Sequence, residues 1–160
     1  MINIINGDIL TAQNTIICQQ VNHQGVMGSG LAKQIREKYP DIFNGYQAYC
    51  LDTTFEYIRD FGVILCYEPN PNIQRVIIAN ICSQEFYGRD GKCYTDYKAL
   101  ESGFRSIDQL IDEHKYGTTK YSVSIPYKIG CGLGGGDWDI VYAMIQDIFE
   151  GNEVYIYKYK

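Results

Sequence analysis

The sequence predicts a three-layer α/β/α sandwich with a sheet that is at least partly parallel. Along the 160 residues, short apolar strands alternate with segments whose apolar residues recur at helical spacing. Two of the strands, residues 62–67 (GVILCY) and 75–81 (RVIIANI), are almost continuously apolar, which is typical of strands with helices on both faces of the sheet. Neither an internal repeat nor a low-complexity linker interrupts the alternation, so we expect residues 1–160 to form one domain.

The first half of the chain begins with two strands and then two helical segments. The second strand (TIICQQV) is rich in β-branched residues, and Pro40 is expected to close the first helix because proline cannot continue one. The expected elements are strands at 1–5 and 15–21, helices at 31–40 and 41–51, and strands at 62–67 and 75–81 joined by a turn at 69–72.

The second half contains a polar loop at 84–94, two helices and two strands. We expect Thr95 to cap the first helix and Asp137 the second, because hydroxyl and carboxylate side chains accept hydrogen bonds from the first helical N–H groups. Strands are expected at 121–126 and 154–159. The apolar residues at helical spacing are Tyr97, Leu100, Phe104, Ile107 and Ile111 in the first helix, and Val141, Met144, Ile145 and Ile148 in the second.

A glycine tract, residues 130–136 (GCGLGGG), lies between the strand that ends at Pro126 and the helix that Asp137 begins. A strand, a glycine loop and a helix start together direct backbone N–H groups and a helix dipole at an anion. A simple tight turn needs fewer glycines, and five in seven positions cost conformational entropy on folding. The tract therefore predicts a phosphate-binding loop.

A second glycine loop, residues 22–30 (NHQGVMGSG), follows the strand at 15–21 and precedes a helix. Because ligands in such sheets bind beyond the carboxyl ends of the strands, both loops are expected to face one crevice and to hold a diphosphate from two sides. Gly130, Gly132 and Gly135 match G-x-G-x-x-G, but no βαβ unit with an acidic residue follows, which argues against a dinucleotide dehydrogenase. GVMGSGLAK lacks the Gly-Lys-Ser/Thr of a P-loop.

The bulk composition limits the partners. A net charge of −5 with no basic stripe argues against a nucleic-acid polymer as the main partner, and no apolar run is long enough for a membrane span. The six cysteines show no CxxC pair or metal-ligand spacing, and the N-terminus lacks the regions of a signal peptide. We therefore expect a cytoplasmic monomer with reduced cysteines, no metal and no cofactor.

Three segments carry a resemblance to a known family: GDI at 7–9, VNHQGVMGSGLA at 21–32 and IPYKIGCGLGGGDW at 125–138. Together, in this order and spacing, they resemble the macro domain, and in particular its terminal ADP-ribose glycohydrolase and ADP-ribose-1″-phosphate phosphatase branches. The resemblance implies an ADP-ribose pocket on a mixed, mostly parallel six-stranded sheet between helices.

The resemblance also implies a role for each matching position. Asp8 is expected to accept a hydrogen bond from the adenine amine, and Tyr159 to pack on the adenine. The implied adenine-side residues are Gly7, Asp8, Ile9 and Tyr159, and those at the distal ribose are Gln20, Val21 and Asn22. The first phosphate loop comprises Gly25, Val26, Met27, Gly28, Ser29, Gly30, Leu31 and Ala32, and the second Ile129, Gly130, Cys131, Gly132, Leu133, Gly134 and Gly135.

The catalytic residues are the point at which the sequence departs from the family. The glycohydrolase branch uses a lysine and an aspartate, and the matching positions here hold Gln84 and Gly134. Lys92 lies in the same loop as Gln84 and can take the place of the family's lysine only if this loop folds back. His23, as a general base, and Asp137 are the candidate catalytic residues; Cys131 has no neighbouring histidine in sequence and is expected to pack. Backbone amides that orient a water are a further route.

These observations lead to two hypotheses. The first is an enzyme that binds ADP-ribose and hydrolyses ADP-ribose-1″-phosphate or an ADP-ribosyl ester on a protein. The second is a non-catalytic ADP-ribose reader module, which Gln84 and Gly134 favour.

Overall fold

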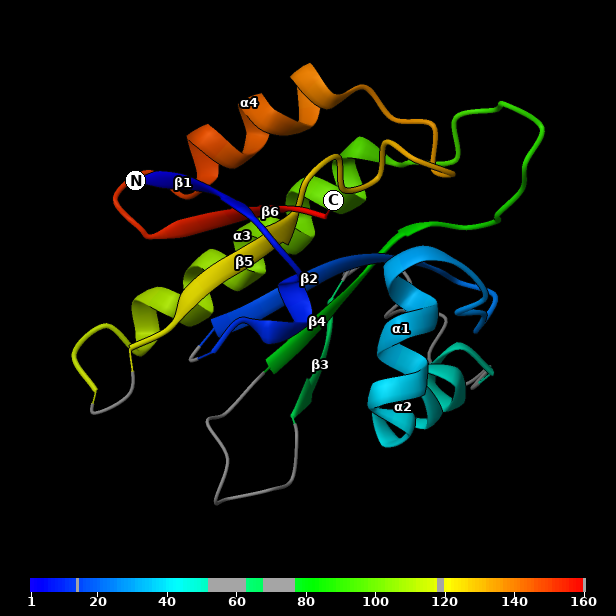
Figure 1. Cartoon of the computed structure of the whole chain (residues 1–160), viewed down its shortest axis with the longest axis horizontal. Coiled ribbons are helices and arrows are strands. Elements are labelled where there is room, and N and C mark those ends of the chain that lie inside the picture. Colours follow the sequence, from blue (N-terminus) through cyan, green and yellow to red (C-terminus); the bar gives the residue numbers. More distant parts are fainter. Residues whose placement is uncertain (14, 52–62, 68–76, 118–119, 160) are drawn as a thin grey trace.

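The computed structural model describes residues 1–13, 15–51, 63–67, 77–117 and 120–159. Its centre is a six-stranded sheet in the order β1-β6-β5-β2-β4-β3 (Figure 1). All neighbouring strands are parallel except β3 and β4, which are antiparallel. The strands are β1 (Ile2–Asn6), β2 (Thr15–Asn22), β3 (Val63–Tyr67), β4 (Ile77–Gln84), β5 (Ser122–Pro126) and β6 (Val154–Lys158). The expected mixed, mostly parallel six-stranded sheet is confirmed.

The two apolar strands differ in their position in this sheet. β4 lies in the interior between β2 and β3, and its residues 77–83 are buried. β3 lies at the edge, because β2 already occupies the other side of β4. The burial of β4 agrees with the expected strand that helices cover on both faces, and the burial of the β3 side chains lies outside what the structure describes. The expected turn at 69–72 and the first residues of the strand expected at 75–81 lie outside the described residues.

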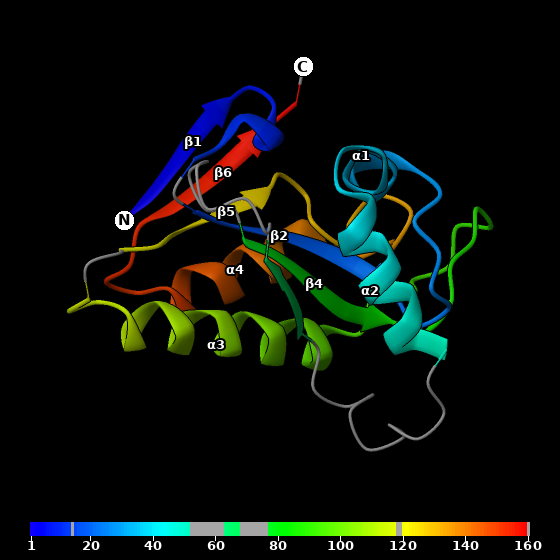
Figure 2. The ribbon, with the colours of Figure 1, turned by 90° about the horizontal axis from the view of Figure 1, so that it is seen from below.

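Helices cover both faces of the sheet (Figure 2). α3 (Tyr97–Glu113) and α4 (Trp138–Ile148) lie on one face, and α1 (Gly30–Lys38) and α2 (Pro40–Leu51) on the other. Alternate residues of β2 divide the core accordingly: Ile16 and Cys18 pack with α3 and α4, whereas Ile17 packs with the α1 side. The three layers are confirmed. No helix in the described part of the chain is both long and apolar enough to cross a membrane.

The starts of the helices agree with the sequence in one case and correct it in two. Asp137 caps α4, since its carboxylate accepts a hydrogen bond from the Asp139 N–H at 2.8 Å. Asp96, not Thr95, caps α3 by accepting from the N–H groups of two following residues at 2.9 and 3.1 Å. α1 ends at Lys38, just before Pro40, as expected, but Pro40 is itself the first residue of α2, a position at which proline fits without losing a hydrogen bond.

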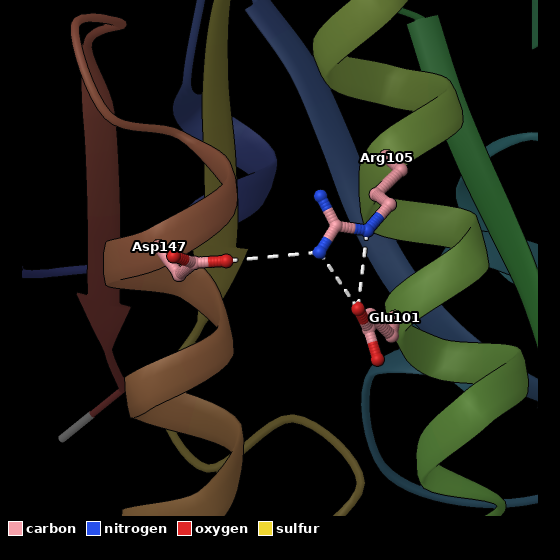
Figure 3. Close-up of polar contacts among 3 residues, drawn as sticks. All are labelled: Glu101, Arg105 and Asp147. Carbon is pink, nitrogen blue, oxygen red and sulfur yellow. Dashed lines mark hydrogen bonds and ion pairs between the residues drawn. The ribbon is translucent and has the colours of Figure 1, made fainter.

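An ion-pair cluster joins the two helices on the α3/α4 face. Arg105 of α3 contacts Glu101 Oε1 at 2.8 Å and Asp147 Oδ2 of α4 at 3.6 Å (Figure 3). All three side chains are more than a third exposed, so solvent screens their charges and the cluster contributes little to stability. The buried Phe104 and Phe149, whose rings meet edge to face at 5.8 Å, contribute to the apolar contact between α3 and the end of α4.

The topology places three loops together beyond the carboxyl ends of the parallel strands β2, β4 and β5. Because β2, β4 and β5 run parallel, the loops that follow them emerge beyond the same edge (Figure 1). A bulge between β2 and β4 adds one residue there: Val21 pairs with Cys82, but Asn22 pairs with Gln84. Ser83 is the extra residue, and such bulges redirect side chains next to functional sites.

Candidate ligand-binding site

A cavity of about 600 Å³ opens at this edge, between the loops that follow β2, β4 and β5. This volume lies in the range of pockets that hold cofactor-sized ligands. Its lining residues are Gln19, Gln20, Val21, Asn22, Val26, Gly28, Ser29, Gly30, Leu31, Ala32, Gln84, Tyr87, Gly88, Arg89, Pro126, Tyr127, Lys128, Ile129, Gly130, Gly132, Leu133 and Gly134. The two glycine loops therefore face one crevice, as their positions in the sequence predict.

The first glycine loop is shaped by Asn22 at the end of β2. The Asn22 amide donates to the Val26 carbonyl at 2.7 Å, and its Oδ1 accepts from the Gln24 N–H at 3.0 Å. The buried Tyr46 hydroxyl of α2 donates to the Asn22 carbonyl at 2.6 Å. The side-chain amide of Asn22 is thus used to close the loop, although Asn22 also lines the cavity.

The first turn of α1 presents N–H groups at the cavity. Gly30, Leu31 and Ala32 line it, and the first N–H groups of a helix have no acceptor within the helix. Ser29 precedes the helix in an extended conformation, and its side chain makes no capping hydrogen bond. These N–H groups and the helix dipole form a site for an anion.

The second glycine loop is held by a buried polar bridge. The Thr95 hydroxyl donates to the Gly130 carbonyl at 2.7 Å and accepts from Gln20 Nε2 at 2.8 Å. The Gly134 carbonyl accepts from the backbone N–H of Thr95 at 3.0 Å, and Ser83 Oγ donates to Gln20 Oε1 at 2.8 Å. This hydroxyl, expected to cap α3, instead connects the loop to the sheet.

The bridge leaves part of the second loop free to bind a ligand. The N–H groups of Cys131, Gly135 and Gly136 bond to carbonyls within the loop at 2.9 to 3.0 Å. Those of Gly132, Leu133 and Gly134 donate to no acceptor among the described residues, and all three residues line the cavity. Successive free N–H groups on a constrained backbone are typical of an anion site.

The charge of the lining matches this chemistry. Although the chain carries a net charge of −5, the described residues that line the cavity include Arg89 and Lys128 and neither aspartate nor glutamate. Lys128 has a positive φ of 60°, and its ammonium lies 5.6 Å from the centre of the Tyr127 ring. The cavity is therefore locally positive on an acidic protein.

Gln84 and Gly134, where the family resemblance implies a lysine and an aspartate, both belong to the bridge. Gln84 Oε1 accepts from Gln20 Nε2 at 2.8 Å, and its Nε2 donates to the Phe86 carbonyl at 2.8 Å. A Cβ atom at Gly134 would lie 2.6 Å from the Gly130 carbonyl oxygen and 2.6 Å from Thr95 Oγ1. The loop in this conformation has no room for a side chain at position 134.

The two candidate catalytic side chains do not line the cavity. Asp137 is exposed and is used as the cap of α4. His23 follows β2, and its backbone N–H donates to the Gln84 carbonyl at 3.0 Å. Cys131 also lies outside the lining; burial, above all, raises the pKa of its thiol, which disfavours a nucleophilic thiolate.

Several residues expected to bind a ligand lie outside the lining for identifiable reasons. Met27 is fully buried, and Gly25 packs on α2 with a positive φ of 71°. Asp8 caps a short 3₁₀ helix, η1 (Ile9–Thr11), in which Ile9 is buried. Tyr159 is 73% exposed beyond β6. The expected binding residues outside the lining are Gly7, Asp8, Ile9, Gly25, Met27, Cys131, Gly135 and Tyr159.

The loop after β1 and the end of β6 nevertheless lie next to one end of the cavity. The Gly7 N–H donates to the Lys158 carbonyl at 3.0 Å, and the Tyr127 N–H donates to the Tyr157 carbonyl at 2.8 Å. Tyr127 lines the cavity, so Asp8 and Tyr159 belong to the neighbourhood of its β5 end.

Seven further lining residues, apart from Gln84, were not expected from the sequence: Gln19, Tyr87, Gly88, Arg89, Pro126, Tyr127 and Lys128. Pro126, Tyr127 and Lys128 stand inside the IPYKIG segment and were identifiable from their position between strand and glycine tract. The segment with Tyr87 to Arg89 carries no periodicity, and only the strand that precedes it indicates its place at the cavity.

We predict that Thr95→Val lowers the free energy of unfolding by about 2 kcal/mol, because valine leaves Gln20 Nε2 and the Gly130 carbonyl without their buried partner. Thr95→Ser keeps the hydroxyl and serves as the matched control. Urea denaturation measures both variants. Equal stability of the valine and serine variants would show that the bridge contributes nothing.

We also predict that Gly134→Ala destabilises the protein by about 3 kcal/mol, because the new methyl group overlaps a backbone oxygen. Gly132→Ala is the control: a Cβ there meets no atom within 4 Å. Thermal unfolding followed by circular dichroism compares the two variants. A Gly134→Ala protein as stable as Gly132→Ala would contradict the packing of this loop.

The comparisons with known proteins agree with this geometry. No protein-family model matches the sequence. The DNA ADP-ribosyl glycohydrolase of Thermus aquaticus is 27% identical over 161 residues, which cover 99% of this chain and 41% of that protein. This chain spans about two fifths of the length of the curated glycohydrolases that it matches.

Solved structures have the same fold over the whole chain. The macrodomain of Thermus aquaticus DarG matches with a TM-score of 0.76 and 25% identity, over 99% of this chain and 98% of that one. Thermosipho africanus DarTG in complex with ADP-ribose matches with a TM-score of 0.75 and 25% identity, over 99% of this chain and 41% of that one. The three-layer fold, the two glycine loops beyond the same ends of the strands and these similarities together show that the chain has the fold of these macrodomains.

Proposed function

We propose that this macro domain binds ADP-ribose in the cavity and hydrolyses the bond between the distal ribose and the group attached to it. The observation that carries the proposal is the pair of facing loops with free N–H groups, one at the start of α1 and one at Gly132 to Gly134. A diphosphate offers acceptor oxygens to both sides at once. The Thermosipho africanus relative, which has the same fold, was solved with ADP-ribose.

The order of the strands suggests how the ligand lies. With the diphosphate between the loops, the adenosine points toward Tyr127 and the adjacent ends of β1 and β6, where Asp8 and Tyr159 stand. The distal ribose then points toward β4 and the loop that contains Gln84 and Arg89. The bond to be cleaved lies on this second side.

For the hydrolysis we favour a water molecule oriented by amides and by the bound diphosphate. Water oxygen forms a bond to C1″ of the distal ribose while the bond from C1″ to the acceptor oxygen breaks. The leaving oxygen takes up the proton that the water loses. None of the described lining residues is a histidine or a carboxylate, so the reaction relies on positioning and oxyanion stabilisation, and turnover should be slow.

A non-catalytic reader is the second candidate. Both ends of the Gln84 amide are engaged in hydrogen bonds, and position 134 has no room for a carboxylate. A cavity that only binds ADP-ribose needs neither the lysine nor the aspartate of the glycohydrolase branch. Binding is common to both candidates, and turnover separates them.

The acceptor attached to ADP-ribose can be a 1″-phosphate, a protein carboxylate or DNA. The Thermus aquaticus relative is a DNA ADP-ribosyl glycohydrolase by name. The net charge of −5 argues against extended contact with a nucleic-acid polymer, so a DNA substrate would be held through its ADP-ribosyl group. We also propose that residues 1–160 act as one monomeric domain in the cytoplasm, a proposal that the single sheet and the free cysteines support.

Isothermal titration calorimetry with ADP-ribose tests the pocket. The unchanged chain should bind ADP-ribose with a Kd between about 1 μM and 1 mM. Gly132→Leu should abolish detectable binding, because its side chain protrudes into the diphosphate site, while thermal unfolding stays within about 2 °C of the unchanged chain. Gly45→Leu, on the exposed face of α2 and outside the cavity, is the control for binding. Undiminished binding by Gly132→Leu would place the ligand elsewhere.

A turnover assay tests the hydrolysis. The chain is incubated with ADP-ribose-1″-phosphate, an ADP-ribosylated protein ester and an ADP-ribosylated oligonucleotide, and release of ADP-ribose is followed by chromatography. Release that exceeds the uncatalysed rate from at least one substrate, and that Gly132→Leu removes, is expected. Tight binding of ADP-ribose without any release would leave the reader as the function.

A further inference from the structure

We propose that Arg89 is a specificity-determining residue that binds a phosphate on the acceptor side of the distal ribose. The inference rests on the proposed function, because it assumes ADP-ribose in the cavity with its distal ribose toward β4. It adds a substrate class: acceptors that carry a phosphate close to the bond that is cleaved.

Arg89 lies at the appropriate end of the cavity. Its loop follows β4, whereas Lys128, the other cation among the described lining residues, follows β5. β2 separates these two strands in the sheet, so the two cations approach the ligand from opposite ends. Lys128 stands on the adenosine side and Arg89 on the side of the distal ribose.

The guanidinium of Arg89 is not neutralised by its own loop. The neighbouring Asp90 pairs with Lys92 Nζ at 3.1 Å and accepts a hydrogen bond from the Tyr94 hydroxyl at 2.9 Å. The hydrogen bonds from Tyr94 and Lys92 lower the pKa of Asp90, so Asp90 is ionised, yet its charge is used within the loop. Arg89 itself makes no ion pair or hydrogen bond with any residue that the structure describes.

The loop holds its backbone in place without a ligand. The Lys92 N–H donates to Asp90 Oδ1 at 3.2 Å, which closes a turn around Gly91. Gly88 packs against the Tyr94 ring so closely that a Cβ atom there would overlap the hydroxyl. Arg89 is therefore carried on a braced backbone between these contacts, which reduces the ordering cost of binding.

The chemistry of arginine fits a phosphate better than an ester of a protein carboxylate. Its planar fork donates two parallel hydrogen bonds to a phosphate, with charge assistance. A protein ester has no anion at this place. A phosphate can come from two sources, the 1″-phosphate of a small molecule or the backbone of an ADP-ribosylated oligonucleotide, and both present the same group to Arg89.

The test compares Arg89→Gln with Arg105→Gln, a control that removes the same charge from the exposed surface of α3 outside the cavity. Affinities for ADP-ribose, ADP-ribose-1″-phosphate, an ADP-ribosylated oligonucleotide and an ADP-ribosylated peptide are measured by displacement of a fluorescent ADP-ribose analogue, read before turnover. Arg89→Gln should weaken binding of at least one phosphate-bearing acceptor about tenfold, and that of ADP-ribose and the peptide less than about twofold. Arg89→Lys should recover part of the loss, and Arg105→Gln should change nothing.

The outcomes separate the proposals. A loss with ADP-ribose-1″-phosphate identifies the small molecule as the source of the phosphate, and a loss with the oligonucleotide alone identifies nucleic acid. Equal losses for ADP-ribose and every acceptor would place Arg89 at the diphosphate, and no loss would leave it without a role; either result overturns the inference while ADP-ribose binding stands. If the unchanged chain does not bind ADP-ribose, the proposed function itself fails.

Discussion

The hydroxyl of Thr95 connects β2 with the second glycine loop, two of the parts that form the cavity, at the end of the segment between β4 and α3. It accepts from Gln20 of β2, donates to the Gly130 carbonyl of the second glycine loop, and stands just before the cap of α3. Since it is nearly buried, loss of either partner would leave an unsatisfied polar group in the interior. The conformation of the loop, and with it the direction of its free N–H groups, depends on this hydroxyl.

The same bridge gives a physical account of the two departures from the family pattern. Gln20 Nε2 donates to Gln84 Oε1 at 2.8 Å, and a Cβ atom at Gly134 would approach the same nitrogen to 2.7 Å. A side chain at position 134 would displace Gln20 and thereby release Gln84. Positions 84 and 134 are coupled through the side-chain amide of Gln20. Replacing only one of them by the catalytic residue of the glycohydrolase branch would therefore not restore the catalytic pair.

The sequence predicts the fold and the backbone of the site better than the side chains around it. Strands, helix periods and glycine loops are local patterns, and they place both loops at one edge of the sheet. Thr95 and Asp96 are both acceptable caps in sequence, and only tertiary contacts give the hydroxyl another partner. Arg89 stands in a loop without periodicity, so its approach to the cavity depends on the turn closed by Asp90. His23 and Asp137 are near the loops in sequence, but the chain directs neither of them into the lining.

A binding site built mostly from backbone amides on an acidic protein has a consequence for the rate of association. The field of an amide dipole decays over a few ångströms, whereas the net charge of −5 acts over a Debye length of about 8 Å at physiological ionic strength. An anionic ligand is therefore repelled by the net charge of the protein at a distance and attracted near the cavity, where Arg89, Lys128 and the free N–H groups act. Added salt screens the long-range repulsion and the attraction to Arg89 and Lys128 alike, but it leaves the short-range contacts with the amides almost unchanged.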